Sequence, residues 1–292
     1  MEHEVKFLIE HDHEYFERCN LVISRGFHRT NEQNLKQNLH ILNKVQLNKD
    51  SVLEVLSIGS GDGQADSLFV DAALSMGNSL RYVAVEPSEK EVEKFKALVE
   101  SKKMEGHWSN ATFDFHPITV QQYLLDARKT EERQHFDIIS CPESAYFFTD
   151  AGEVFAELYQ LLNKGGILLN TMCGGAWEQL TIEVAKYFPS KTVALPGSST
   201  LREILQKRLP EVDFQVVTRE YSLDVGECFQ EGSRVGNMLL DFFVQILDFR
   251  KDAPKEVVDK IMAFMDENCS RTADGKRNFV VCEEDIIISR KH

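Results

Sequence analysis

The sequence has no long apolar run and no paired cysteine motif. No stretch approaches the roughly 18 apolar residues that a membrane-spanning helix needs, and the polar, acidic N-terminal residues contain no apolar signal-peptide core. The six cysteines are scattered without a CxxC pair, which argues against a zinc site or a disulfide framework. Free thiols are typical of a reducing cytosol. We therefore expect a cytoplasmic protein with no membrane span and no bound metal.

Positive charge is also scarce. Lysine and arginine together number 33, against 47 aspartate and glutamate residues, which leaves a formal net charge of −14. A surface this negative repels phosphate backbones and anionic lipid, so nucleic acid and membranes are poor candidate partners. A small neutral or cationic molecule is compatible with it. At about 150 residues per domain, the chain corresponds to one large domain or two modest ones, and we expect a monomer.

Short apolar segments alternate with helical patterns through the middle of the chain. Val-, Ile- and Leu-rich runs predict strands at residues 52–58, 82–85, 111–116, 136–141 and 167–171. Helical patterns follow at residues 65–76, after the N-cap Ser88, near 120–127 and at 151–162. Strands and helices that alternate at this spacing predict an α/β fold of the Rossmann-like kind, in which helices cover both faces of a parallel sheet.

The two ends of the chain have a different pattern. The N-terminal residues, up to about residue 45, predict helices with a break at 26–31. The C-terminal part predicts helices at 201–209, 237–247 and 257–265, strands at 214–221, 279–282 and 286–289, and a turn at the acidic residues 283–285. We expect this part to complete the sheet and to form a smaller cap.

A glycine-rich loop follows the first predicted strand. It reads Gly-Ser-Gly-Asp-Gly at residues 59–63 and precedes a predicted helix, which is where glycines let a backbone turn sharply and approach a ligand. The dinucleotide pattern GxGxxG fails in both frames, because Gln64 and Asp66 stand where its last glycine is required. A phosphate-binding Gly-Lys-Ser/Thr sequence is absent as well.

Glu86 ends the next predicted strand and is the acidic partner of this loop. A carboxylate in that place can accept hydrogen bonds from both ribose hydroxyls of a nucleoside. S-adenosylmethionine (SAM) has an adenosine and no phosphate, so it needs no basic residues around it. The alternative is that the glycines form a tight turn and Glu86 caps a helix. We favour a SAM site at Gly59, Ser60, Gly61 and Glu86.

Several motifs resemble those of the histamine N-methyltransferase family. They are Leu-Ser-Ile-Gly-Ser-Gly-Asp-Gly at residues 56–63, Val-Glu-Pro-Ser at 85–88, Phe-Asp-Ile-Ile at 136–139, the aromatic pair at 146–147, Trp177, and the segments 227–229, 241–243 and 275–276. The run at 161–169 also resembles the segment before strand five of class I SAM-dependent methyltransferases. The match covers nearly the whole chain and implies a SAM-binding sheet with a smaller substrate-binding cap.

The resemblance also implies site residues. The cofactor contacts carried over by position are Gly59, Glu86, Glu91, Val120 and Pro142. The implied catalytic and acceptor-binding residues are His28, which stands where the family has a glutamate, and Glu143, which stands where it has a glutamine. The implied aromatic lining consists of Tyr15, Tyr146, Phe147, Trp177 and Phe243.

These observations predict a SAM-dependent N-methyltransferase that acts on a small imidazole or amine. Histamine is the first candidate acceptor, and a carnosine- or histidine-like imidazole compound is the alternative. A non-catalytic protein that binds SAM or an amine is a further possibility, because the polar acceptor residues differ from those of the family. We expect residues 1–50 to contribute helices to the acceptor site, 51–195 to form the SAM-binding core, and 196–292 to complete the sheet and the cap.

Overall fold

The computed structural model of the protein describes residues 5–26, 31–45, 51–130, 134–189, 195–273 and 275–291. The chain divides into two compact units. Unit 1 consists of Met1–His28, Cys173–Thr200 and Thr218–Glu284, and unit 2 of Arg29–Met172, Leu201–Val217 and Asp285–His292. Both units are therefore built from segments far apart in the sequence.

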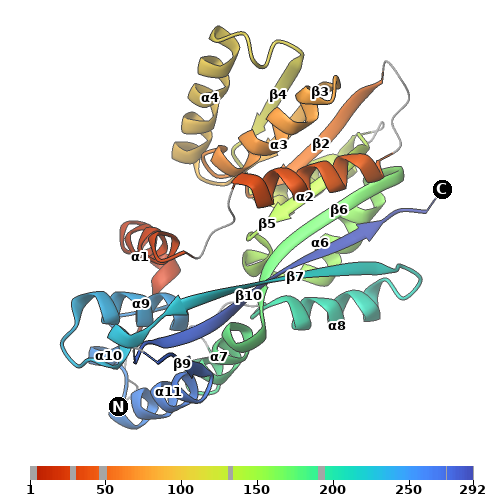
Figure 1. Cartoon of the computed structure of the whole chain (residues 1–292). Helices are drawn as coiled ribbons and strands as arrows, with labels where there is room; N and C mark the ends of the chain where they lie inside the picture. The colour runs from red at the N-terminus through yellow and green to blue at the C-terminus, as the bar shows by residue number, and fades with distance from the viewer. Residues whose placement is uncertain are drawn as a thin grey trace. The chain divides into compact units, whose positions relative to one another are not determined.

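The sheet has the strand order β4-β3-β2-β5-β6-β10-β7 (Figure 1). Its parallel part consists of β2 (Val52–Ile58), β3 (Ser79–Val85), β4 (Ala111–His116), β5 (Phe136–Pro142) and β6 (Leu162–Gly174). The remaining strands in this order are β7 (Phe214–Asp224) and β10 (Arg277–Ser289), and β9 (Cys269–Arg271) pairs with β10 outside it. The N–H of Gly165 donates to the carbonyl of Arg290, while Thr171 contacts Asp285, so β10 runs opposite to β6.

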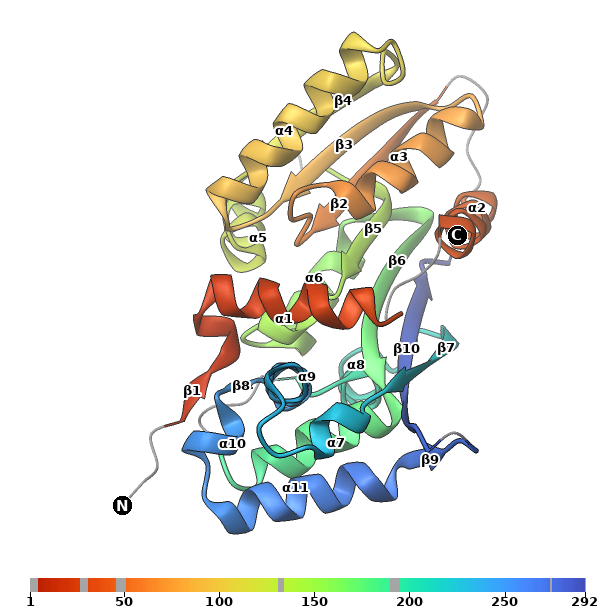
Figure 2. The same ribbon diagram turned by 60° about the vertical axis from the view of Figure 1, so that its left-hand side comes forward.

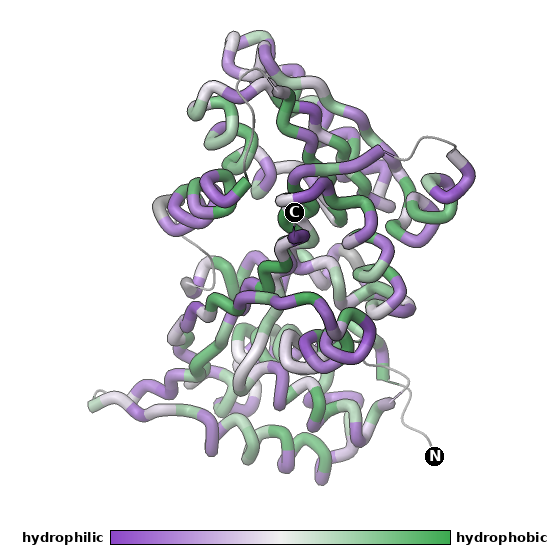
Figure 3. Tube along the Cα trace, turned by 90° about the vertical axis from the view of Figure 1, so that its right-hand side faces the viewer, coloured by the Kyte–Doolittle hydropathy of each residue, from purple (hydrophilic) through white to green (hydrophobic). Residues whose placement is uncertain are grey.

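Helices cover the sheet of unit 2 on both sides. Figure 2 shows α2 (Asn31–Lys44) and α3 (Gln64–Ser75) on one side, and α5 (Val120–Lys129) and α6 (Ala151–Gln160) on the other. The helices alternate between hydrophilic and hydrophobic colours along their turns in Figure 3, as expected for helices that bury one face. Together with the mostly parallel sheet, this arrangement confirms the predicted Rossmann-like α/β fold.

Local sequence signals explain where several helices of unit 2 begin. The hydroxyl of Ser88 accepts a hydrogen bond from the N–H of Glu91 at the start of α4 (Glu89–Met104). Thr119 caps α5 in the same way, and Asp150 caps α6. Because these side chains satisfy N–H groups that have no partner within the helix, the helix starts are readable from the sequence.

Unit 1 is mainly helical. Its helices are α1 (Asp12–Ser24), α7 (Gly175–Ala185), α9 (Arg234–Val244), α10 (Phe249–Asp252) and α11 (Lys255–Glu267). α9 packs against α1 and α7, and α7 packs against α11 (Figure 2). α8 (Ser198–Arg208) begins in unit 1 and continues in unit 2. Within the described parts of the chain, no helix is long and apolar enough to cross a membrane.

Two predictions for the C-terminal half are wrong. The helix expected at 237–247 ends at Val244, because Gln245 adopts a left-handed conformation with φ 59°, and β8 (Ile246–Leu247) then pairs with β1 (Lys6–Phe7). The strands expected at 279–282 and 286–289 form one strand, β10, which continues through the acidic residues expected to form a turn. Those charges have partners within the sheet: Glu283 binds Arg219, and Asp285 binds Thr171.

The remaining elements β9 (Cys269–Arg271), α7 and α10 were not predicted. The predicted division at residues 50 and 195 uses three continuous segments, whereas each structural unit combines separate ones. The binding roles assigned to the three predicted segments stay predictions.

Candidate active site

The order of the strands reverses at β2. From β2 the chain proceeds to β3 and β4 on one side of the sheet, and β5 and β6 then lie on the other side. In open α/β sheets, ligands bind beyond the carboxyl ends of the strands at such a switch point. Here the glycine loop follows β2, Glu86 follows β3, and Pro142 ends β5. Unit 2 therefore places these predicted cofactor residues on one edge of the sheet.

The loop needs its glycines for different reasons. Gly59, Gly61 and Gly63 all have positive φ, at 73°, 53° and 78°. A Cβ on Gly59 would lie 2.5 Å from the Cβ of Ser144, and one on Gly63 would lie 2.1 Å from the ring of Phe95. A Cβ on Gly61 would meet no atom within 4 Å. The backbone at Gly61 therefore faces open space, where a ligand can approach it.

Glu86 binds the loop directly. Its Oε2 accepts a hydrogen bond of 3.0 Å from the N–H of Gly61, and its Oε1 accepts one of 2.9 Å from the N–H of Ser88. Because Ser88 is the N-cap of α4, the bond to its N–H agrees with the interpretation of Glu86 as part of a helix cap. The bond to Gly61 places the same carboxylate beside the loop, as the interpretation of Glu86 as a ribose-binding acid requires. A carboxylate oxygen can accept two hydrogen bonds, so both oxygens retain capacity for ribose hydroxyls.

Two hydroxyl groups beside Gly59 are buried without a hydrogen-bond partner. They are the Oγ atoms of Ser60 and Ser144. A buried hydroxyl without a partner is costly, and it points to a bound polar molecule or water at that place. The open backbone at Gly61, the carboxylate of Glu86 and these hydroxyls together fit a nucleoside cofactor without phosphate.

The other implied cofactor residues also lie at this edge. Glu91 is in the first turn of α4, where its carboxylate forms an ion pair of 2.8 Å with Lys94. Val120 is the first residue of α5 and is buried, and Pro142 is half-buried at the end of β5. The structure thus brings all of the predicted cofactor residues to one edge, and their contacts with the cofactor stay predictions.

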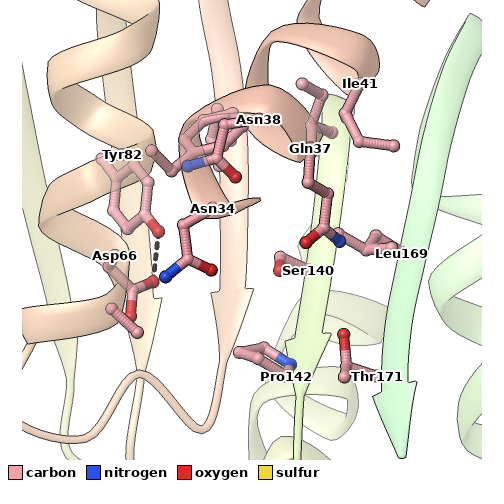
Figure 4. Close-up of a pocket in the computed structure, with 14 residues that line it drawn as sticks. Asn34, Gln37, Asn38, Ile41, Asp66, Tyr82, Ser140, Pro142, Leu169 and Thr171 are labelled. Atoms are coloured by element: carbon pink, nitrogen blue, oxygen red, sulfur yellow. Dashed lines mark hydrogen bonds between the residues drawn. The ribbon is translucent and has the colours of Figure 1, made fainter. Parts of the chain in front are cut away.

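A small cavity, lined mostly by apolar surface with several polar side chains, lies between α2 and the sheet of unit 2 (Figure 4). Its volume is about 80 Å³, and its wall includes Asn34, Gln37, Asn38, Asp66, Tyr82, Ser140, Pro142 and Thr171. This volume is below the roughly 300 Å³ at which small-molecule pockets begin, so the cavity is too small for a whole nucleoside cofactor. Of these residues, sequence reasoning assigned only Pro142 to a site. The signal it did not use was Asp66, an acid in the first turn of α3.

Three predicted acceptor residues form a group after β5. Glu143 has φ 50°, which is rare for a residue with a side chain, and its N–H donates to the carbonyl of Thr171 at 3.0 Å. The hydroxyl of Tyr146 donates to Oε2 of Glu143 at 3.0 Å. The ring of Phe147 is 51% exposed and lies 6.3 Å from that of Tyr146. Strained backbone is common at functional sites, which makes Glu143 a candidate acceptor contact.

The other predicted aromatic residues lie in unit 1, where they surround Phe242. The ring centroid of Phe242 lies 5.5 Å from that of Trp177 and 6.2 Å from that of Tyr15. The indole N–H of Trp177 donates to the carbonyl of Phe243, whose side chain is fully buried. Phe242 lies in the family-like segment 241–243, but it was not among the predicted lining residues. Because these residues and the Glu143 group belong to different units, a shared acceptor pocket stays a prediction, and His28 lies outside the described residues.

Cys141 lies at the end of β5, close to Glu143 in sequence. Burial raises the pKa of the Cys141 thiol well above its usual range. A thiol that stays protonated is a poor nucleophile, and Cys141 is fully buried, so its environment fits a packing role.

Comparison with known proteins agrees with this geometry. Residues 56–170 match the family model of a methyltransferase domain. The histamine N-methyltransferase of Xenopus tropicalis is 27% identical over 81% of this chain and 81% of its own length, and histamine N-methyltransferase B of Xenopus laevis is 29% identical over 78% of each. Carnosine N-methyltransferase 2 of Gallus gallus is 24% identical over 78% of this chain and 71% of its own length.

Solved structures share the fold. The YcgJ protein from Bacillus subtilis has a TM-score of 0.51 and 14% identity, covering 89% of this chain and 99% of that one. The plantazolicin methyltransferase BamL, solved with S-adenosylhomocysteine (SAH), has a TM-score of 0.51 and 13% identity, covering 97% of this chain and 91% of that one.

The fold, the glycine loop and the matched domain define a class I methyltransferase whose cofactor is SAM. More particularly, the chain is similar to the histamine N-methyltransferases, and this similarity extends beyond the matched domain. The predicted family resemblance, fold class and cofactor are thereby confirmed.

Proposed function

We propose that the protein transfers the methyl group of SAM to a nitrogen of a small imidazole or amine, with histamine as the first candidate acceptor. The observation that carries this proposal is the similarity to histamine N-methyltransferases over about four-fifths of the chain, well beyond residues 56–170. The net charge of −14 is compatible with a cationic acceptor. A monomeric state and a cytoplasmic location stay predictions.

SAM supplies an electrophilic methyl group on a sulfonium. The protein binds the acceptor and orients it toward that methyl group. The attacking nitrogen must carry a lone pair in line with the methyl carbon. A neutral imidazole has one N–H and one nitrogen with a lone pair. If the carboxylate of Glu143 accepts the N–H, the other nitrogen is left to attack. The bond from Tyr146 to Oε2 orients that carboxylate, and a carboxylate has about four sites that can accept hydrogen bonds.

A carnosine- or histidine-like acceptor is the second candidate. Its support is the similarity to carnosine N-methyltransferase 2 of Gallus gallus, together with His28, which replaces a family glutamate and would suit an anionic substrate. Histamine, carnosine and histidine all contain an imidazole ring, but only carnosine and histidine carry a carboxylate. One methylation assay with all three compounds therefore separates the two candidates.

The test combines calorimetry with product analysis. SAM and SAH are titrated into the full chain, and histamine, carnosine, histidine and a set of simple amines are then incubated with protein and SAM. Mass spectrometry detects an added methyl group on each acceptor. We expect methylation of an imidazole compound.

The variants Glu143→Gln and Glu143→Ala both keep a side chain on the strained backbone at this position. A difference between them and the unchanged protein therefore reports on the carboxylate. We expect the alanine variant to raise the KM of the acceptor at least about tenfold, because a charge-assisted hydrogen bond is lost, with SAH affinity unchanged. SAH binding without methylation of any acceptor would favour a non-catalytic binding protein. Acceptor kinetics that Glu143→Ala leaves unchanged would show that Glu143 does not hold the acceptor.

A further inference from the structure

Asp66, in the first turn of α3, is a buried carboxylate outside the residues assigned to the cofactor. It is 6% exposed and lies on the wall of the cavity shown in Figure 4. Its Oδ1 accepts a hydrogen bond of 2.6 Å from the hydroxyl of Ser57 and a second one from the hydroxyl of Tyr82. Burial raises the pKa of Asp66, so the site penalises its charge. An apolar residue would fill this space without the free-energy penalty of a buried carboxylate. The presence of Asp66 therefore points to a role in positioning other groups.

Ser57 and Asp66 stand on opposite sides of the glycine loop. Ser57 is the next-to-last residue of β2, and Asp66 is the third residue of α3, so the hydrogen bond between them joins the two ends of the loop. A loop rich in glycine has much conformational freedom to lose when it becomes ordered. Glu86 fixes its middle at Gly61, whereas the Ser57–Asp66 bond fixes the separation of its ends.

We propose that Asp66 is a positioning residue that holds the glycine loop in its cofactor-binding conformation by tying Ser57 to the start of α3. Without this bond, the ends of the loop move apart in the cofactor-free protein, and binding must first order the loop, which lowers affinity. Tyr82 donates to the same oxygen from the middle of β3, which is not one of the two elements that flank the loop in sequence. The two donors therefore separate loop positioning from general stabilisation.

Single substitutions in the full chain test this difference. SAH binding is measured by calorimetry, mobility of residues 59–63 by hydrogen exchange in the cofactor-free protein, and stability by thermal unfolding. We expect Ser57→Ala to weaken SAH binding about tenfold and to speed hydrogen exchange in the loop. Without the Ser57–Asp66 bond, part of the binding free energy is used to order the loop. We expect Tyr82→Phe to lower the melting temperature and to leave SAH affinity within about twofold.

Two substitutions of Asp66 itself test whether the accepting oxygen, rather than the charge, is required. Asp66→Asn keeps an oxygen that can accept from both hydroxyls, so near-normal SAH affinity is expected, whereas Asp66→Ala removes that oxygen and weakens binding at least as much as Ser57→Ala. Asp71→Ala is the matched control. Asp71 lies further along the same helix and accepts a hydrogen bond of 2.7 Å from the indole of Trp108, so its loss affects stability but not the loop.

If Asp66→Ala does not fold, the variants Ser57→Ala and Tyr82→Phe still test whether the Ser57–Asp66 bond positions the loop. Normal SAH affinity in Ser57→Ala would overturn the proposal, and so would equal losses of affinity in Ser57→Ala and Tyr82→Phe. A loss in Asp66→Asn as large as in Asp66→Ala would also overturn it, because charge rather than the accepting oxygen would then be required.

Discussion

The guanidinium of Arg18 donates two hydrogen bonds, of 3.1 and 3.0 Å, to one carboxylate oxygen of Asp241. The pair joins α1 to α9 within unit 1, and both side chains are almost fully buried. Asp241 also accepts from the N–H groups of Asp248 and Phe249, which begin the segment after β8. A single carboxylate thus connects the N-terminal helix to two later parts of the same unit.

Breaking this pair should destabilise unit 1 strongly. Arg18→Met leaves the Asp241 carboxylate buried without its cation, and we expect the free energy of unfolding to fall by about 3–5 kcal/mol. Denaturant unfolding measures the change. Arg271→Met is a matched control, because Arg271 forms an exposed ion pair of 2.9 Å with Asp266 in the same unit. Its loss should cost less than about 1 kcal/mol, and equal losses would contradict a special role for the buried pair.

The Glu86 carboxylate should determine cofactor affinity. Glu86→Ala removes the acceptor of the Gly61 N–H, which is also the predicted acceptor for the ribose hydroxyls, and we expect SAH binding to weaken by about 10- to 100-fold. Calorimetry with SAH measures this. The control is Glu89→Ala, which removes an exposed acid three residues further on, at the start of α4. If both variants bind SAH equally well, Glu86 has no role in the cofactor site.

The loop glycines should differ in their tolerance of a side chain. Gly63→Ala combines a positive φ with a clash against Phe95, and we expect a loss of stability of about 2–4 kcal/mol from strain and overpacking. Gly61→Ala meets no atom, so only the φ penalty of about 1–2 kcal/mol is expected. Because its methyl group would stand in the space open to a ligand, we also expect weaker SAH binding. Thermal unfolding with and without SAH tests both expectations.

The thiol of Cys269 should react with alkylating agents only in alkaline solution. Burial raises its pKa to about 11. Below that pH the thiolate fraction is small and rises about tenfold per pH unit, so labelling by iodoacetamide should accelerate continuously between pH 8 and about 11. In the unfolded chain, with an ordinary pKa near 8.5, labelling should level off above about pH 9. Mass mapping of labelled peptides follows the residue, and fast labelling of folded protein at pH 8 would contradict the raised pKa.

The agreement between sequence and structure is best where the signals are local. The glycine loop, the acid at Glu86 and the cap at Ser88 lie within a few residues of the strand ends they mark. Sequence reasoning failed where distant partners decided the conformation. The acidic residues 283–285 look like a turn because isolated charges avoid a strand, yet Arg219 and Thr171 supply partners that keep them in β10.

The chain by itself determined the alternation of strands and helices and the composition of the cofactor loop, because apolar runs, glycines and caps act on their immediate neighbours. Only the tertiary structure decided which polar side chains meet inside the units. The bond between Ser57 and Asp66 and the pair of Arg18 with Asp241 depend on how elements pack. Burial then decides the energetic weight of such groups, because an unpaired charge or hydroxyl is inexpensive in water and costly in a core.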